Sequence, residues 1–448
     1  MKEQRHRFLC AVCALALVLT AVLAPAAWAA EGTQPEAEDS EKTTLTAEDA
    51  SEMHEVDAAV TALTDSDAYE QMSRDERLDA ALRQLDDLAG QGLVEKSSIR
   101  VDEENGMVSY RYPCGVLGGI LLTQPDELPE TTVQPGQAEP DDTNGLNRFS
   151  GSRALMPMTA DVRRAMEQRT RNLKEQENAL PDQVGTAVIY YAFDNTVNST
   201  RFPYYAYMRG FWEGMGLRTT MNTRVTLSDL RRMDRYDLCI LSAHGADYTY
   251  GYGTFQKRTR TEPIILLMEE ATFYKDIIYS FDLLSHRAIK VNGRYAVTAD
   301  FFRNAYRSGQ LSNTIIYSET CEFLGVSGGV DESMANALLE GGARAVLGYV
   351  NNVYTVYSRS MLWDTVNHLL LGQSIGDALT HAKDTYGEND IIWYTEQGGR
   401  RPHAVPAYLV LYGDADAKLD VPDVLLADSS TGETSFQDVV QDILEQAA

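Results

Sequence analysis

From residue 186 onward, hydrophobic residues alternate between short continuous runs and helical spacings. The continuous runs are 187–192 (AVIYYA), 238–241 (LCIL), 314–317 (TIIY), 343–348 (ARAVLG) and 407–411 (AYLVL). Such runs are typical of buried parallel strands. Helical patterns lie between them at 204–215, 226–233, 333–339, 358–371 and 374–386. This alternation predicts an α/β domain over 186–425, with a mostly parallel sheet and helices on both faces. A hairpin is expected at 289–297, inside a stretch that interrupts the pattern.

The N-terminal part has another pattern, which predicts a small α+β module within 31–123. Ser73 and Glu76 form an S-x-x-E capping box before leucines at helical spacing, and Asn105-Gly106 marks a hairpin turn. Polar, acidic composition predicts disorder at 31–50 and 124–148. A linker with a helix is expected over 124–185, and an apolar stripe predicts a last helix within 426–448.

The first thirty residues have the pattern of a secretory signal peptide. Lys2, Arg5 and Arg7 precede an apolar run, and Ala27-Trp28-Ala29 offers small residues for cleavage. A retained anchor is the alternative, but the run is short for a membrane span. We therefore expect a secreted protein, with residues 1–30 removed and no stable membrane insertion afterwards.

Charge and cysteine content narrow the function. The chain has 448 residues and a net charge of −27, and residues 31–150 hold 28 acidic against 8 basic residues. This acidity argues against a nucleic-acid partner. Three cysteines follow the predicted signal peptide, so at least one thiol is free or pairs with another chain; they are Cys114, Cys239 and Cys321.

Two predicted strands end in reactive residues. His244 and Gly245 follow the LCIL strand, and Cys321 follows the TIIY strand. Sites in open α/β sheets form at the carboxyl ends of strands, so a thiol and an imidazole could meet there as an activated nucleophile. Gly245 would let the backbone approach a substrate and offer its N–H to an oxyanion. The alternative is a buried structural cysteine and a loop histidine.

These segments resemble the caspase-like cysteine peptidases, closest to the gingipain, clostripain and CHAT-domain groups. The resemblance rests on YDLCILSAHG, NTIIYSETC, DESMANALLEGGARAVLGYV and YLVLYGDADAKL, and covers roughly 186–420. Ala415 stands where the gingipain segment has proline. The family implies a caspase-like sheet and peptide-bond hydrolysis by a Cys–His dyad without an essential third residue.

Residue by residue, the resemblance makes Cys321 the nucleophile and His244 the general base and acid. The backbone N–H groups of Gly245 and Cys321 would bind the oxyanion. Glu319 lies two residues before Cys321, where an acid lines the pocket for a basic P1 side chain in some members. The resemblance thus implies cleavage after Arg or Lys; a purely structural role for Glu319 is the alternative.

The resemblance also bears on cofactors and partners. No cofactor is required; Ca²⁺ is an option at Asp414 and Asp416, although paired acids in a loop are commoner as turn residues. His368 and His381 fall on predicted helices, where we expect surface positions. The partner is a protein or peptide substrate, and basic residues at 148–174 suggest self-cleavage that releases residues 31–123 as a prosegment. A plain accessory domain is the alternative for this N-terminal part. The alternative function is a non-catalytic caspase-like scaffold that binds a protein or peptide.

Overall fold

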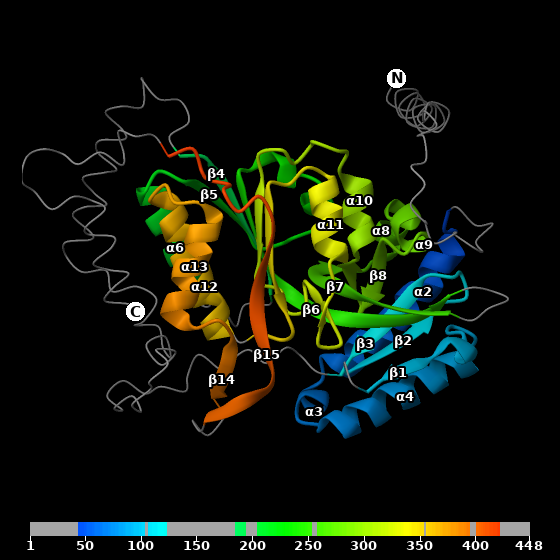
Figure 1. Cartoon of the computed structure of the whole chain (residues 1–448). Coiled ribbons are helices and arrows are strands. Elements are labelled where there is room, and N and C mark those ends of the chain that lie inside the picture. Colours follow the sequence, from blue (N-terminus) through cyan, green and yellow to red (C-terminus); the bar gives the residue numbers. More distant parts are fainter. Residues whose placement is uncertain are drawn as a thin grey trace, which may run out of the picture. The chain divides into compact units, whose positions relative to one another are not determined.

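One long mixed sheet connects almost all strands of this protein, and helices cover both of its faces (Figure 1). The structure is a computed structural model that describes residues 44–103, 106–122, 184–193, 204–252, 258–353, 355–394 and 400–421. The predicted signal peptide, most of the 124–185 linker and the last helix lie outside these residues. The sheet and its helices confirm the predicted α/β class.

We call one part of this sheet the parallel half. Its spatial order is β5-β4-β6-β10-β13, followed by antiparallel β15 and β14. The bounds are β4 (Thr186–Ala192), β5 (Arg218–Asn222), β6 (Leu238–Tyr252), β10 (Ile315–Ser318), β13 (Ala345–Val350), β14 (Asp390–Tyr394) and β15 (Arg400–Gly413).

We call the rest of the sheet the wing. Residues 244–252 of β6 turn away from the parallel half and pair antiparallel with β7, and the order continues as β7-β9-β8-β3-β2-β1. The bounds are β1 (Arg100–Asp102), β2 (Met107–Arg111), β3 (Leu117–Leu121), β7 (Arg258–Glu270), β8 (Ala288–Val291) and β9 (Arg294–Val297). A separate small hairpin joins β11 (Gly325–Val326) to β12 (Gly329–Val330).

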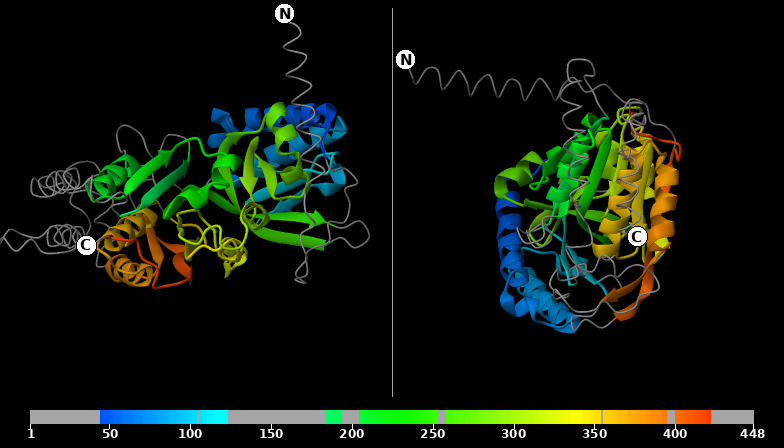
Figure 2. Two further views of the ribbon diagram at one scale, coloured as in Figure 1. Left: turned by 90° about the horizontal axis from the view of Figure 1, so that it is seen from above. Right: turned by 90° about the vertical axis from the view of Figure 1, so that its left-hand side faces the viewer.

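Alternation along the strands divides the core into two layers. In β4, Ala187, Ile189 and Tyr191 pack toward one set of helices, whereas Val188 and Tyr190 pack toward the other. Figure 2 shows α12 and α13 on the opposite side of the sheet from α2 and α4. The first layer contains α6 (Tyr204–Gly214), α12 (Thr355–Leu370) and α13 (Ile375–Tyr386). The second contains α7 (Leu227–Leu230), α10 (Ala299–Ala305) and α11 (Ser333–Glu340).

The N-terminal elements belong to the wing. They are α2 (Ala47–Thr64), α3 (Asp67–Glu70), α4 (Arg74–Gly90), a 3-10 turn (Lys96–Ser98) and β1 to β3, and they lie with α8 (Phe273–Ile278) and α9 (Ser280–Leu284). The Ser73–Glu76 capping box is confirmed at the start of α4. The prediction of disorder up to residue 50 is wrong for its end, because Thr46 caps α2 and Ala50 is buried.

A fully buried lysine ties the N-terminal part to the rest of the wing. The Lys290 ammonium on β8 lies 2.5 Å from an Asp57 oxygen on α2 and 2.8 Å from an Asp276 oxygen on α8. Hydroxyls of Tyr112 and Tyr295 donate to the remaining carboxylate oxygens at 2.7 Å. The strand β3 also pairs with β8, so the strands of residues 44–122 are part of the main sheet. The sequence alone predicts a small α+β module here and does not show this connection.

Candidate functional site

The register between two parallel strands brings His244 and Cys321 to one edge of the sheet. Leu241 of β6 lies opposite Ser318 of β10, and the Glu319 N–H donates to the Leu241 carbonyl at 2.8 Å. His244 and Cys321 each follow their paired position by three residues. Parallel strands end at the same edge, so the two side chains belong to the carboxyl edge of the sheet, as the sequence predicted.

Gly245 is the point of closest approach between the two segments. A Cβ at Gly245 would lie 2.0 Å from the Cys321 carbonyl oxygen and 2.4 Å from the Thr320 methyl group. Any side chain would therefore push the segments apart. The sequence suggested that Gly245 lets a substrate approach; the structure shows that it admits the backbone of Cys321 itself.

Cys321 is held by the loop that leads from β13 into α12. Its side chain is buried, the Val353 N–H donates to Sγ at 3.4 Å, and Sγ lies 3.7 Å from the Val353 carbonyl oxygen. The next residue, Glu322, has a φ of 54°, and its N–H donates to Asn351, which has a φ of 71°. Left-handed backbone at non-glycine residues is uncommon and clusters at functional sites. The chain thus turns sharply immediately after the candidate nucleophile.

His244 carries a neutral imidazole at neutral pH. Burial lowers the pKa of His244 to about 4, and the positive charge of Arg294 contributes. The Phe193 ring meets the imidazole edge-on, with centroids 4.5 Å apart. Within the described ranges, the buried Nδ1 atom has no hydrogen-bond partner. An aromatic contact therefore orients this ring, and the neutral imidazole can accept a proton.

Glu319 is buried at the carboxyl edge of the sheet, and hydroxyl groups donate hydrogen bonds to both of its carboxylate oxygens. Its Oε2 accepts a hydrogen bond from Tyr205 of α6 at 2.8 Å, and its Oε1 accepts one from Ser358 of α12 at 3.0 Å. Burial raises the pKa of Glu319, which the Tyr205 bond and the charge of Arg359 oppose. The carboxyl group is thus part of a buried polar network; its contact with a substrate remains a prediction.

A pair of acids beside His244 and Cys321 was not singled out from the sequence. The Glu322 carboxyl accepts the Asp247 N–H at 2.9 Å, and Asp247 in turn accepts the Ser327 N–H. Burial raises the pKa of Glu322 to about 8, with the nearby Asp247 charge adding to it, and burial raises the pKa of Asp247 to about 6. Both carboxyl groups therefore hold their protons to higher pH than they would in water. The available signal was position, since Glu322 follows Cys321 directly and Asp247 follows His244 by three residues.

Two further candidates make contacts within the protein. Cys239 is fully buried in β6, as predicted, and none of the three described cysteines forms a disulfide. The Asp416 N–H donates to an Asp414 carboxylate oxygen at 3.0 Å, which is the geometry of a turn.

None of the helices in the described part of the chain has the length and apolar character needed to cross a bilayer.

Comparison with known proteins adds no further information on this edge. No model of a known protein family matches the chain, and no curated protein matches its sequence. The interpretation of the site therefore depends on the geometry and chemistry of its own residues.

Proposed function

We propose that this protein is a caspase-like cysteine endopeptidase in which Cys321 and His244 form the catalytic dyad. The observation that carries the proposal is the β6–β10 register, which brings both residues to one carboxyl edge of the sheet. Gly245, which follows His244, has no side chain and so leaves space for the Cys321 backbone. The motifs YDLCILSAHG and NTIIYSETC support the same assignment through their resemblance to the family.

The chemistry follows from the protonation of the two groups. The neutral His244 imidazole takes the proton from the Cys321 thiol, and the thiolate attacks the carbonyl carbon of the scissile peptide bond. The resulting oxyanion accepts hydrogen bonds from the N–H groups of Gly245 and Cys321. The imidazolium returns the proton to the leaving amine as the C–N bond breaks, which leaves a thioester. Water, deprotonated by His244, then releases the acid product and the free thiol.

Cleavage after Arg or Lys is the narrower part of the proposal. A buried carboxylate at Glu319 would pair with a guanidinium or ammonium group. Arg359 already supplies positive charge near this carboxyl, and Tyr205 and Ser358 occupy its oxygens. A basic P1 side chain would therefore have to displace at least one of these hydroxyls. The variant Glu319→Gln, which keeps the acceptor but loses the charge, isolates this contribution.

Export and activation complete the proposal. We infer that the protein is secreted and that it cleaves itself within 148–174, a segment outside the described residues. The buried Lys290 contacts and the β3–β8 pairing support a refinement: residues 44–122 would stay attached after such a cut. Mass spectrometry and gel filtration of the mature protein test this, and loss of the N-terminal fragment would contradict it.

One observation favours a non-catalytic binding scaffold as second candidate. A groove of about 400 Å³ lies against β4 and β5, and its lining includes the exposed Arg224, Arg232 and Arg235. Neither His244, Glu319 nor Cys321 lines it. A basic groove away from the dyad would suit an acidic peptide held without cleavage.

Peptide hydrolysis separates the two candidates. The chain from Glu31 onward is assayed on fluorogenic peptides with Arg, Lys, Asn or Asp at P1, with and without Ca²⁺ and a reducing agent. Turnover that disappears in Cys321→Ala and His244→Ala, but persists in Cys114→Ala, supports the peptidase. Turnover of only Asn or Asp peptides keeps the dyad and rejects the Glu319 pocket. No turnover by a folded, reduced and proteolytically matured chain rejects the peptidase in favour of the scaffold.

A further inference from the structure

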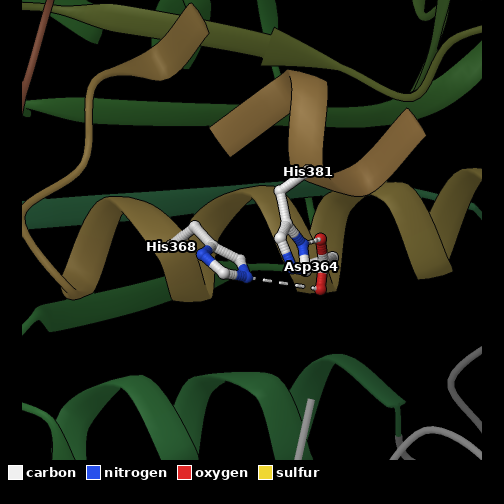
Figure 3. A group of neighbouring side chains, drawn as sticks. All are labelled: Asp364, His368 and His381. Carbon is white, nitrogen blue, oxygen red and sulfur yellow. Dashed lines mark hydrogen bonds and ion pairs between the residues drawn. The ribbon is translucent and has the colours of Figure 1, made fainter. Parts of the chain in front are cut away.

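Two histidines that the sequence placed on the surface meet inside the first helical layer. Asp364 and His368 lie one turn apart on α12, and His381 reaches them from α13 (Figure 3). Asp364 and His368 are buried, whereas the His381 side chain is 35% exposed. The expectation of surface positions is wrong for His368 because residues 357–370 of α12 are buried on all sides.

The three side chains point their polar atoms toward one another. His381 Nδ1 lies 2.8 Å from Asp364 Oδ2, and His368 Nε2 lies 3.8 Å from Asp364 Oδ1. The two imidazole rings lie with centroids 3.8 Å apart. One potential ligand atom from each residue falls within 4.8 Å of the others. Tetrahedral coordination with bonds of about 2.0–2.1 Å separates ligand atoms by about 3.4 Å, so small side-chain rotations suffice.

Buried polar atoms here are not fully satisfied by the protein. Among the described residues, Asp364 Oδ1 and both ring nitrogens of His368 have no hydrogen-bond partner of good geometry, although the Gln373 side chain lies near the His368 imidazole. Leaving such atoms buried and unpaired is costly, and each exception calls for a physical cause.

We propose that Asp364, His368 and His381 bind one Zn²⁺ ion that ties α12 to α13. Two imidazoles and one carboxylate are a donor set that Zn²⁺ favours over Ca²⁺ or Mg²⁺. The partly exposed His381 side chain gives the ion a route in from solvent, and water would supply the fourth ligand. The proposal is independent of the peptidase function.

Metal binding is tested on the full chain from Glu31 carrying Cys321→Ala, so that the candidate dyad cannot bind the ion through its thiol. Isothermal titration with Zn²⁺ should give one site, and Zn²⁺ should raise the melting temperature by several degrees, reversed by EDTA. The partly exposed His381→Gln and the buried His368→Gln should each weaken binding at least about 100-fold. His54→Gln, which changes an exposed histidine on α2, should bind as before.

The outcome decides between a metal site and a plain hydrogen-bonded cluster. His381→Gln keeps a polar side chain at the helix surface, so its folding, checked by circular dichroism, is expected even if His368→Gln unfolds. If the parent chain binds one Zn²⁺ and the folded His381→Gln variant does not, the site is confirmed. No Zn²⁺ bound by the parent chain, or equal binding by parent and folded His381→Gln, overturns the proposal.

Discussion

The two halves of the sheet are held by different chemistry. The parallel half packs apolar strands between helices on both faces, with residues such as Ile189, Ile240 and Leu347 fully buried. The wing also has an apolar core, but it buries the Lys290 ammonium between two carboxylates. Apolar packing is adaptable, whereas a buried ion cluster is stable only when every charge has its partner. A single change at Lys290 should therefore cost more stability than a comparable apolar substitution in the core of the parallel half.

β6 belongs to both halves, and the candidate dyad lies where it passes from one to the other. Residues 238–243 pair in the parallel half and residues 244–252 pair in the wing. His244 is thus the first residue on the wing side, while Cys321 follows a strand of the parallel half. The geometry between them depends on how the two halves join.

The largest expected effect is on the buried charge of the wing. Lys290→Met should lower the free energy of unfolding by about 3–5 kcal/mol, because Asp57 and Asp276 would be left buried without a countercharge. Chemical denaturation monitored by circular dichroism measures this.

A compensated variant serves as the control. The triple variant Lys290→Met, Asp57→Asn, Asp276→Asn should regain most of the lost stability, because no unpaired charge remains. If the triple variant is as unstable as the single one, packing around Lys290 and not its charge holds the wing.

The second-largest effect is expected on catalytic efficiency, at Gly245, where β6 passes from the parallel half into the wing. Gly245→Ala should lower kcat/KM on a cleaved peptide by about 100-fold or more, because its methyl group would displace the Cys321 backbone by about an ångström. Gly251→Ala is the matched control in the same strand, since its Cβ would meet nothing closer than 3.8 Å. Equal activity in both variants would show that the junction tolerates a side chain.

The smallest effect is the pH dependence set by the acid pair. The pKa of Glu322, about 8 in the folded protein, exceeds its ordinary value of 4.5, so the pair stabilises the fold at low pH and less as pH rises through 8. Between about pH 5 and 7, the free energy of unfolding of the parent chain should therefore decrease with pH more steeply than that of Glu322→Gln. The difference in slope should be up to about 1.4 kcal/mol per pH unit. Denaturation curves at several pH values measure the slope, and parallel curves for the two proteins would contradict the assignment.

The parallel half was largely predictable from the sequence, whereas the wing was predictable only in separate elements, such as the helix begun by Ser73 and the hairpin at 289–297. Runs such as AVIYYA and TIIY are buried on both faces and therefore stand out without any knowledge of neighbours. By contrast, β6 continues eleven residues beyond LCIL, to Tyr252, through a segment rich in glycine and tyrosine. Helix α2 is acidic and is recognisable only by Met53, Val56 and Val60, whose burial depends on distant partners.

The candidate site shows the same division. The placement of His244 and Cys321 at one edge was predictable, because both follow the paired parallel stretch of β6 and β10 by three residues. The continuation of β6 past His244 into the wing was not predictable. The Glu319 contacts and the Asp364–His368–His381 cluster were not, because each depends on which helix packs against which. The periodicity of apolar residues indicates that a helix has a buried face, but it does not identify which side chains of the neighbouring helices or strands contact that face.

Selective labelling of the three cysteines tests the dyad most directly. The chain from Glu31 is treated under native, reducing conditions with peptidyl acyloxymethyl ketones bearing Arg, Lys or Asn at P1, and the modified residues are mapped by mass spectrometry. We expect one label per chain on Cys321, lost in His244→Ala, while Cys114 and Cys239 stay unmodified. A folded chain whose Cys321 stays unlabelled, or is labelled equally without His244, would contradict it.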